Sequence, residues 1–147
     1  VNRKMQKKEE QIKLRLKPVL TWKTIIAEIK KIPKGSFVGY DLTERVNRPT
    51  VIAVLPIGYW HGYDRGFSGM AEVLVCGTRA KVLGRVSMDM ISIDVTDVAN
   101  AMVGNVVALI DAASRDTSAD MLATFCNTTS YEILTRLNPL MKRVYTH

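Results

Sequence analysis

MISIDV, at Met90–Val95, places aliphatic side chains at every second position and polar side chains between them. Successive side chains of a β-strand point to opposite faces, so this alternation predicts a strand with one buried face. Four other short segments, bounded by glycine, asparagine or aspartate, have the same β-forming character: Thr50–Leu55, Glu72–Val75, Lys81–Gly84 and Val106–Ile110. Five or six short strands at this spacing favour a mainly-β barrel or sandwich over a βαβ sheet.

The segments before Thr50 extend the predicted β domain toward the N-terminus. Val19–Ile29 is rich in β-branched and aromatic residues and predicts one long strand. Pro33–Ser36 predicts a turn, because proline presets one backbone dihedral and glycine accepts a positive one. A brief strand is expected over Phe37–Asp41, and the polar segment Thr43–Pro49 is expected to form a loop.

Two short late helices are predicted after the strands. Ser118 is the expected N-cap of a helix over Ala119–Phe125, which carries apolar residues on one face. Thr129–Glu132 matches a capping box, in which hydroxyl and carboxylate satisfy free backbone N–H groups, and predicts a second helix through Leu137. Pro139 is expected to stop that helix.

Positive charge is concentrated at the N-terminal end of the chain. Residues 1–34 hold 11 Lys or Arg and 3 Asp or Glu, whereas residues 35–147 hold 10 and 11. Residues 1–15 therefore predict a basic, solvated helix or arm, and residues 16–147 predict the β domain. No aromatic side chain precedes Trp22 to stack on bases, so nucleic-acid binding through the arm is kept only as a weaker alternative.

Length and composition exclude several classes of protein. The 147 residues, 47% of them hydrophobic, suit a single compact domain. Two cysteines are too few for a disulfide scaffold, which favours a reducing compartment such as the cytoplasm. No apolar run approaches the roughly 20 residues that cross a membrane, and no signal peptide is expected. Because the sequence begins with Val1, we expect a piece of a longer polypeptide.

Most motifs that carry familiar chemistry are absent. The sequence has no GxxxxGK(S/T), no GxGxxG, no HExxH and no CxxC, so we expect no metal site. What remains is tyrosine beside glycine, in Gly39-Tyr40 and in Gly58–Tyr63. Glycine lets the backbone turn sharply beside the ring, and a tyrosine hydroxyl near positive charge can act as an acid or base. The alternative is that these rings only pack at strand ends.

Several motifs occur together in the order and spacing of one known family. They are Leu16–Leu20, Pro33–Tyr40, Leu55–Tyr59, Val82–Asp89, Asp94–Asp97 and Ser130–Glu132. With this combination the chain resembles the C-terminal domain of alanine racemases, a family of fold-type III pyridoxal phosphate enzymes, from about Leu16 to Tyr145. The resemblance implies a six-stranded Greek-key β-barrel. A racemase for another small amino acid would look similar.

The resemblance also implies a reaction that uses two bases on opposite faces of the substrate. Pyridoxal phosphate would acidify the Cα–H of a small amino acid, and one base would be a lysine on an N-terminal (β/α)8 barrel. The other would be a tyrosine that this domain supplies to the barrel of a partner subunit in a head-to-tail homodimer. Matched motif by motif, the implied site residues are Tyr40 as that base, Met88 as a backbone N–H donor to the substrate carboxylate, Tyr131 on the cofactor phosphate, and Tyr59, Arg65, Arg85, Asp89 and Arg143 along the access corridor.

The chain departs from the family pattern in ways that bear on function. Trp60-His61 stand where a small residue and aspartate are usual, and Ser87 stands where cysteine is frequent. Further departures are Thr129-Ser130, Asn105 and Met141-Lys142. No lysine lies in a segment like the cofactor-anchoring strand, and a (β/α)8 barrel needs about 250 residues. We therefore expect the chain alone to be inactive; a non-catalytic dimerisation or binding module on the same scaffold is the alternative.

Overall fold

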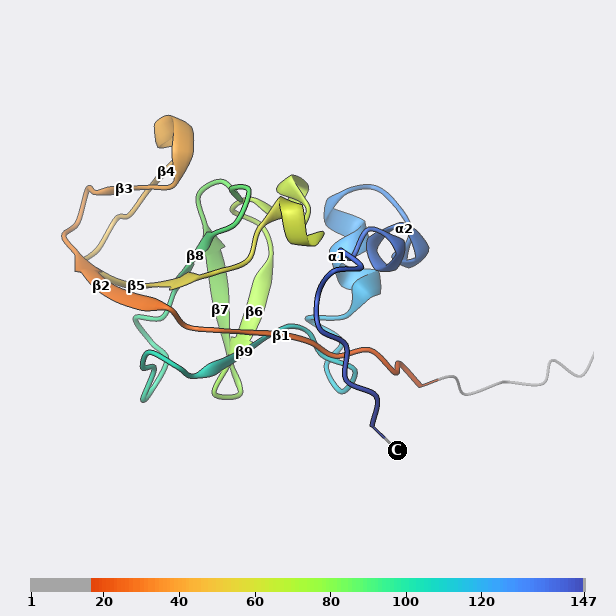
Figure 1. The fold of residues 1–147 in the computed structure, drawn as a ribbon. Coiled ribbons are helices and arrows are strands. Elements are labelled where there is room, and N and C mark those ends of the chain that lie inside the picture. Colours follow the sequence, from red (N-terminus) through yellow and green to blue (C-terminus); the bar gives the residue numbers. More distant parts are fainter. Residues whose placement is uncertain (1–16, 147) are drawn as a thin grey trace, which may run out of the picture.

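The computed structural model describes residues 17–146, so the predicted arm over residues 1–15 lies outside the described part of the chain. This part consists mainly of strands, with two short helices near the C-terminus, which confirms the mainly-β prediction (Figure 1). The strands are β1 Trp22–Ile25, β2 Glu28–Ile32, β3 Phe37–Val38, β4 Glu44–Arg45, β5 Thr50–Leu55, β6 Glu72–Val75, β7 Thr78–Leu83, β8 Ile91–Asp94 and β9 Val106–Ile110. The helices are α1 Ala119–Phe125 and α2 Ser130–Thr135, and the 3-10 turns are η1 Tyr40–Leu42, η2 Tyr59–His61 and η3 Arg65–Phe67.

Within residues 17–146, seven strands form one antiparallel sheet in the order β1-β9-β6-β7-β8-β5-β2. Strands β1 and β2 lie at opposite edges of this order although they follow each other in the chain. The chain passes from one edge to the other between two adjacent residues. Ile26 N–H donates to Asn105 O, next to β9, and Ala27 N–H donates to Val54 O on β5, both at 2.9 Å. The sheet therefore curls until one extended segment bridges its two edges, which gives a barrel-like form.

The prediction of one long strand over Val19–Ile29 is wrong in its bounds. Strand structure begins at Trp22, is interrupted at Ile26-Ala27 and continues to Ile32. The interruption has a geometric cause, because the chain changes its pairing partner there from β9 to β5. A β-forming composition indicates an extended segment but carries no signal for such a change of partner.

The central strands follow a Greek-key connection. Strands β6, β7 and β8 pair in succession, and β9 returns to pair with β6 on its other side. The resulting spatial order, β9-β6-β7-β8, defines a Greek key. With β1 and β2 counted as one bent segment, the described sheet has six strand positions, as the resemblance implied.

The core fills the inside of the curled sheet. Ile91 and Ile93, from the alternating stretch, are 2% and 0% exposed, while Ser92 between them is half-buried. Tyr63 and Phe67 join this core with no exposed surface, and their ring centroids lie 4.8 Å apart. Each large apolar side chain removed from water contributes roughly 1.5–3 kcal/mol. A slip of one residue would turn the isoleucines to solvent, so burial fixes the strand register.

A second, smaller cluster of buried side chains lies beneath the β3–β4 hairpin. It comprises Val38, Val46, Ile52 and Leu83. The strand predicted over Phe37–Asp41 is wrong beyond Val38, because Gly39 adopts a φ of 78° and starts a turn. The loop predicted over Thr43–Pro49 contains the short strand β4, which pairs with β3. The hairpin is thus a separate small unit attached to one end of the sheet.

The two helices lie close to their predicted positions, but only one N-cap is confirmed. Ser118 Oγ accepts the Met121 N–H at 3.1 Å and caps α1 as expected. The capping box predicted at Thr129 is wrong, because the Thr129 side chain makes no capping hydrogen bond. The Glu132 carboxylate instead accepts a hydrogen bond from the Thr128 hydroxyl, outside the helix. A sequence motif alone could not distinguish between these two neighbouring hydroxyl groups.

Candidate functional site

Tyr40 lies at the tip of the β3–β4 hairpin, which projects from the sheet in Figure 1. The residue is 63% exposed. Gly39 before it has a φ of 78°, and Asp41 and Leu42 after it have φ values of 63° and 52°. Glycine adopts positive φ freely, Asp and Asn adopt it less readily, and a branched apolar residue such as leucine adopts it rarely. The chain therefore winds tightly around Tyr40 and displays its ring outside the fold.

The start of the hairpin turn, at Val38-Gly39, passes very close to the end of β7. A Cβ added to Gly84 would lie 2.3 Å from Val38 O, and one added to Gly39 would lie 2.9 Å from Arg85 N. Real Cβ atoms do not approach backbone atoms to 2.3 Å, so the crossing depends on glycine at position 84. Two segments far apart in sequence thereby place Tyr40 beside Arg85.

Asp41 brings together two of the arginines predicted to line the corridor. Its Oδ2 lies 2.8 Å from Arg85 Nε, as an ion pair without hydrogen-bond alignment, and 3.9 Å from Arg65 Nη2. Asp89, which was expected near the same corridor, is exposed and makes no ion pair among residues 17–146. The described structure thus joins Tyr40, Arg65 and Arg85 through a carboxylate that the sequence analysis did not single out.

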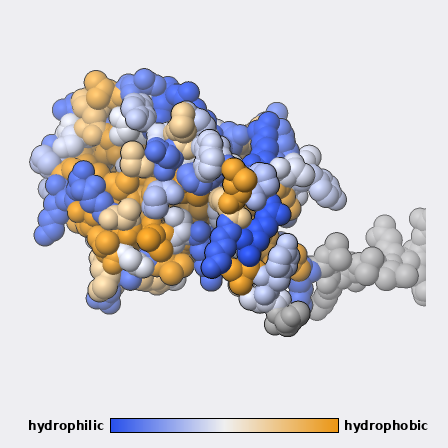
Figure 2. All heavy atoms as spheres, viewed as in Figure 1, coloured by the Kyte–Doolittle hydropathy of each residue, from blue (hydrophilic) through white to orange (hydrophobic). Residues whose placement is uncertain are grey.

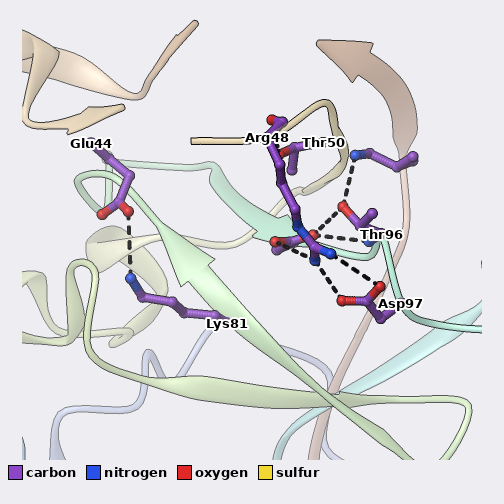
Figure 3. Close-up of polar contacts among 8 residues, drawn as sticks. Glu44, Arg48, Thr50, Lys81, Thr96 and Asp97 are labelled. Atoms are coloured by element: carbon purple, nitrogen blue, oxygen red, sulfur yellow. Dashed lines mark hydrogen bonds and ion pairs between the residues drawn. The ribbon is translucent and has the colours of Figure 1, made fainter. Parts of the chain in front are cut away.

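Ion pairs join β4 and the segment that follows it to the sheet, as Figure 3 shows. Glu44 Oε1 on β4 lies 3.4 Å from Lys81 Nζ on β7. Arg48 Nη2 lies 2.5 Å from Oδ2 of Asp97, just beyond β8, and 3.8 Å from Oδ2 of Asp94, the last residue of β8. The hydrogen bond and positive charge of Arg48 hold the pKa of Asp97 below its usual range. Exposed ion pairs add little to the free energy of unfolding. We therefore read these pairs as contacts that orient β4 and the following segment against the sheet.

Tyr59 and Met88 lie on two turns that are joined through their backbones. Tyr59 N–H donates to Ser87 O, and Trp60 N–H donates to Met88 O, both at 3.0 Å. The turns can touch because Gly58 has no side chain, since a Cβ there would lie 2.5 Å from Met88 O. Met88 is 55% exposed, and its own N–H makes no hydrogen bond within residues 17–146. That N–H is therefore available to an outside acceptor.

His61 and Ser87, two departures from the family pattern, each form hydrogen bonds within the turn that carries them. His61 Nδ1 accepts the Gly58 N–H at 3.2 Å, so the imidazole folds back onto the η2 turn. Ser87 Oγ donates to Met90 O at 2.7 Å and accepts the Met90 N–H at 3.1 Å. Both polar side chains are thus engaged locally, and the Trp60 ring packs edge-on against His61 with centroids 4.9 Å apart.

Tyr131 and Arg143 lie in the C-terminal part of the described chain. Tyr131 is the second residue of α2 and is 80% exposed, and Arg143 is exposed on the segment that follows α2. This segment is tied to the η2 turn: Asn138 N–H donates to His61 O at 3.1 Å, and Asn138 Nδ2 donates to Trp60 O at 3.0 Å. The structure therefore connects the end of α2 to the turn that carries Tyr59.

Apolar side chains lie exposed on the segments that carry the predicted site. Those at least 39% exposed are Phe37, Tyr40, Leu42, Tyr59, Trp60, Met88, Met90, Tyr131, Leu134, Leu140, Val144 and Tyr145. Figure 2 shows hydrophobic residues at the surface of the sheet among hydrophilic ones. Exposed apolar side chains are therefore found on most of the segments that carry the predicted site residues.

Other kinds of site find no support in residues 17–146. None of their helices has the length and apolar composition needed to cross a membrane. No three of their His, Cys, Asp or Glu side chains come together as metal ligands would. Tyr63 follows the packing interpretation: it is fully buried, its hydroxyl makes no hydrogen bond among these residues, and burial raises its pKa. It is therefore no candidate for proton transfer near neutral pH.

The two cysteines differ in environment, and this difference gives a first prediction. Burial and the nearby Asp64 carboxylate raise the pKa of Cys126 to about 11, whereas Cys76 is exposed on the β6–β7 turn. Only thiolates react with iodoacetamide. At pH 8 we expect mass spectrometry to find one modified cysteine, Cys76, and Cys76→Ser to remain unlabelled. Equal labelling of both cysteines at pH 8 would contradict this picture of Cys126.

Sequence reasoning missed the residues that hold the site together. Asp41, Arg48 and Asn138 act through contacts with residues distant in the chain, and none belongs to a short motif. Gly84 carried a usable signal, because a glycine at the end of a predicted strand often marks a close approach of another backbone. The partner at that approach could not be identified from the sequence.

The sequence matches a known family over almost its whole described length. The family model described as "Alanine racemase, C-terminal domain" covers residues 19–145. The alanine racemase of Halothermothrix orenii is 43% identical over 131 residues, which are 88% of this chain and 35% of that protein. The alanine racemase of Methylacidiphilum infernorum is 39% identical over 133 residues, which are 90% of this chain and 34% of that protein.

Solved structures show the same fold at clear sequence identity. The biosynthetic alanine racemase of Pseudomonas aeruginosa is similar with a TM-score of 0.83 and 36% identity, covering 90% of this chain and 36% of that one. The alanine racemase of Bartonella henselae with covalently bound pyridoxal phosphate is similar with a TM-score of 0.79 and 31% identity, covering 86% and 34%. The chain thus spans about a third of the length of these relatives.

Proposed function

This chain belongs to the alanine racemase family, where it corresponds to the C-terminal domain, and on this basis we propose that it completes the active site of an amino-acid racemase. The proposed substrate is alanine, interconverted between its enantiomers by two-base proton transfer. One observation carries the proposal: Tyr40 is displayed, 63% exposed, on a tightly wound turn that Arg65 and Arg85 approach through Asp41.

We assign to Tyr40 the proton transfer on one face of the substrate. Tyr40 is exposed at the hairpin tip and is not part of the small core that supports the hairpin. A base must come within hydrogen-bond reach of the proton it removes, and a displayed ring can reach into a neighbouring subunit. The lysine proposed as the other base lies outside this sequence.

Met88 and the corridor residues would bind and guide the substrate. A carboxylate accepts hydrogen bonds, and the Met88 N–H is a donor without a partner among residues 17–146. Arg85 lies beside the Tyr40 hairpin, so its guanidinium could attract the same carboxylate. Tyr59 is held next to Met88 by the backbone bonds between their turns. Arg65, Asp89 and Arg143 are assigned to the outer part of the corridor.

The residues of this chain fit a supporting contact to pyridoxal phosphate. Tyr131 presents a hydroxyl on the exposed surface of α2, a suitable hydrogen-bond donor to a phosphate. When bound, the cofactor would acidify the Cα–H of the amino acid. Within this chain the proposed contact to it is through Tyr131 alone, and the covalent anchor is assigned to the barrel.

The proposed partner is the N-terminal barrel of a second subunit, in a head-to-tail homodimer. The apolar side chains exposed around Tyr40, Tyr59 and Met88 would be covered in that assembly. A racemase for another small amino acid would use the same surface, and the cytoplasmic location expected from the cysteine content stays a prediction. The separate hypothesis of a non-catalytic dimerisation module predicts the same covered surface without turnover.

The proposal is tested by comparing the chain with a polypeptide in which this domain follows a (β/α)8 barrel. With pyridoxal phosphate and L-alanine in deuterated water, we expect the longer polypeptide to form D-alanine and to exchange the Cα proton. The 147-residue chain alone should do neither. Exchange by the chain alone would refute the proposal that the second base and the cofactor anchor lie on the barrel. A correctly assembled longer polypeptide without turnover would favour the non-catalytic dimerisation module.

A further inference from the structure

We propose that Asp41 is a positioning residue, which fixes the Tyr40 turn by pairing with Arg85 and Arg65. Its importance for turnover rests on the role proposed for Tyr40. The two ion pairs of Asp41, here called the clamp, can be tested without turnover. The turn has an unusual backbone conformation, and Asp41 within it makes charge contacts to two arginines of other segments.

The backbone after Tyr40 adopts a conformation that needs support. Asp41 has φ 63° and ψ 12°, and Leu42 follows with a φ of 52°. Two consecutive left-handed residues that both carry a Cβ are strained, and such strain persists only where surrounding contacts impose it. Glycine would adopt the conformation freely. Aspartate at position 41 adopts this backbone while its carboxylate makes contacts that glycine could not make.

The contribution of that carboxylate is a link between three segments. Asp41 Oδ2 lies 2.8 Å from Arg85 Nε, just after β7, and 3.9 Å from Arg65 Nη2, on η3. These two ion pairs are the only polar side-chain contacts of residues 39–43 to other parts of the described chain. The nearest charged neighbour along the hairpin, Glu44, is already paired with Lys81.

Removing the charge should therefore release the turn. Asp41→Asn keeps the size of the side chain and tolerates left-handed backbone, so it isolates the electrostatic link. Without it, the two guanidinium groups face the turn with no counter-charge. The close backbone approach of Gly39 to Gly84 and the Glu44–Lys81 pair still hold the start of the turn to β7, but no other side-chain pair in the described chain links the turn to η3. We expect Tyr40 to sample several orientations, which lowers the chance of a productive geometry.

The test uses ¹⁵N relaxation of residues 39–43 in the 147-residue chain. Order parameters should be near 0.85 in the parent and fall below about 0.6 in Asp41→Asn. Asp41→Glu should restore part of the order. About 1 M NaCl should loosen the parent turn as the variant does, because salt screens exposed charges. Asp116→Asn, which removes an exposed carboxylate 3.6 Å from Arg79, is the matched control and should leave the turn unchanged.

The outcomes separate this inference from the proposed function. Unchanged order parameters in Asp41→Asn, or a parent turn indifferent to salt, would overturn the clamp whatever Tyr40 does. In the barrel-containing polypeptide, Asp41→Asn should lower kcat by about tenfold with little change in KM, as expected for a displaced base. A fall in kcat/KM through KM alone would also overturn the inference, since it would assign Asp41 to substrate binding. Unchanged turnover in Tyr40→Phe would instead refute the role of Tyr40.

Discussion

Tyr40→Phe, in a polypeptide that joins this domain to its barrel, is expected to lower racemisation in both directions by about 10²–10⁴-fold, the usual contribution of a general acid or base. The change removes one hydroxyl from a side chain that is 63% exposed, so the fold should not be affected. Both directions must slow together, because enantiomers have equal free energies and the equilibrium constant stays at one. The measurement is the rate of circular dichroism change starting from each enantiomer.

Proton exchange gives a sharper signature of two bases. In deuterated water, the Tyr40→Phe variant should still exchange the Cα proton of the enantiomer that presents it to the remaining base. Exchange from the other enantiomer should fall with racemisation. The matched control is Tyr145→Phe, which removes a hydroxyl from a residue that is 86% exposed and has no assigned role. Equal exchange from both enantiomers in Tyr40→Phe would show that Tyr40 is not one of the bases.

The strands were the most predictable feature, because their signal is local. The alternation at Met90–Val95 depends on which face of one strand is buried, and burial of Ile91 and Ile93 follows it directly. Gly39 carried a similar local signal, since glycine allows a sharp turn, but the strand predicted through Asp41 overlooked it and Gly39 adopts a φ of 78°. In both cases the information lies within a few neighbouring residues.

Features that depend on distant contacts could not be predicted in the same way. The bend at Ile26-Ala27 exists because the sheet curls and offers a second edge, which no property of those two residues encodes. Thr129 makes no capping hydrogen bond, because Glu132 accepts a hydrogen bond from the Thr128 hydroxyl instead. Tyr40 lies near Arg85 because the backbone at Val38-Gly39 passes close to Gly84. The sequence indicated that Gly84 ends a strand, but not which segment would approach it.

Gly84→Ala is the second change with a large expected effect, this time on stability. Gly84 is buried with a φ of 67°, and an added Cβ would lie 2.3 Å from Val38 O and 2.9 Å from Val38 C. Left-handed backbone costs alanine about 1–2 kcal/mol, and forcing a methyl group against fixed backbone costs about 1–3 kcal/mol more. We expect a loss of about 3 kcal/mol in the free energy of unfolding, measured by urea denaturation.

Gly77→Ala separates the two parts of that cost, because Gly77 has a φ of 77° but no atom within 4 Å of an added Cβ. It should lose only about 1–2 kcal/mol. The difference between the two variants therefore reports the contact between the end of β7 and the start of the hairpin turn, and that contact is also what brings Arg85 beside Tyr40. If the variants were equally destabilised, the hairpin would not be held against β7 by this crossing. An excess loss in Gly84→Ala, accompanied by disorder of residues 39–43, would show that one close backbone approach supports both the fold and the turn that displays the tyrosine.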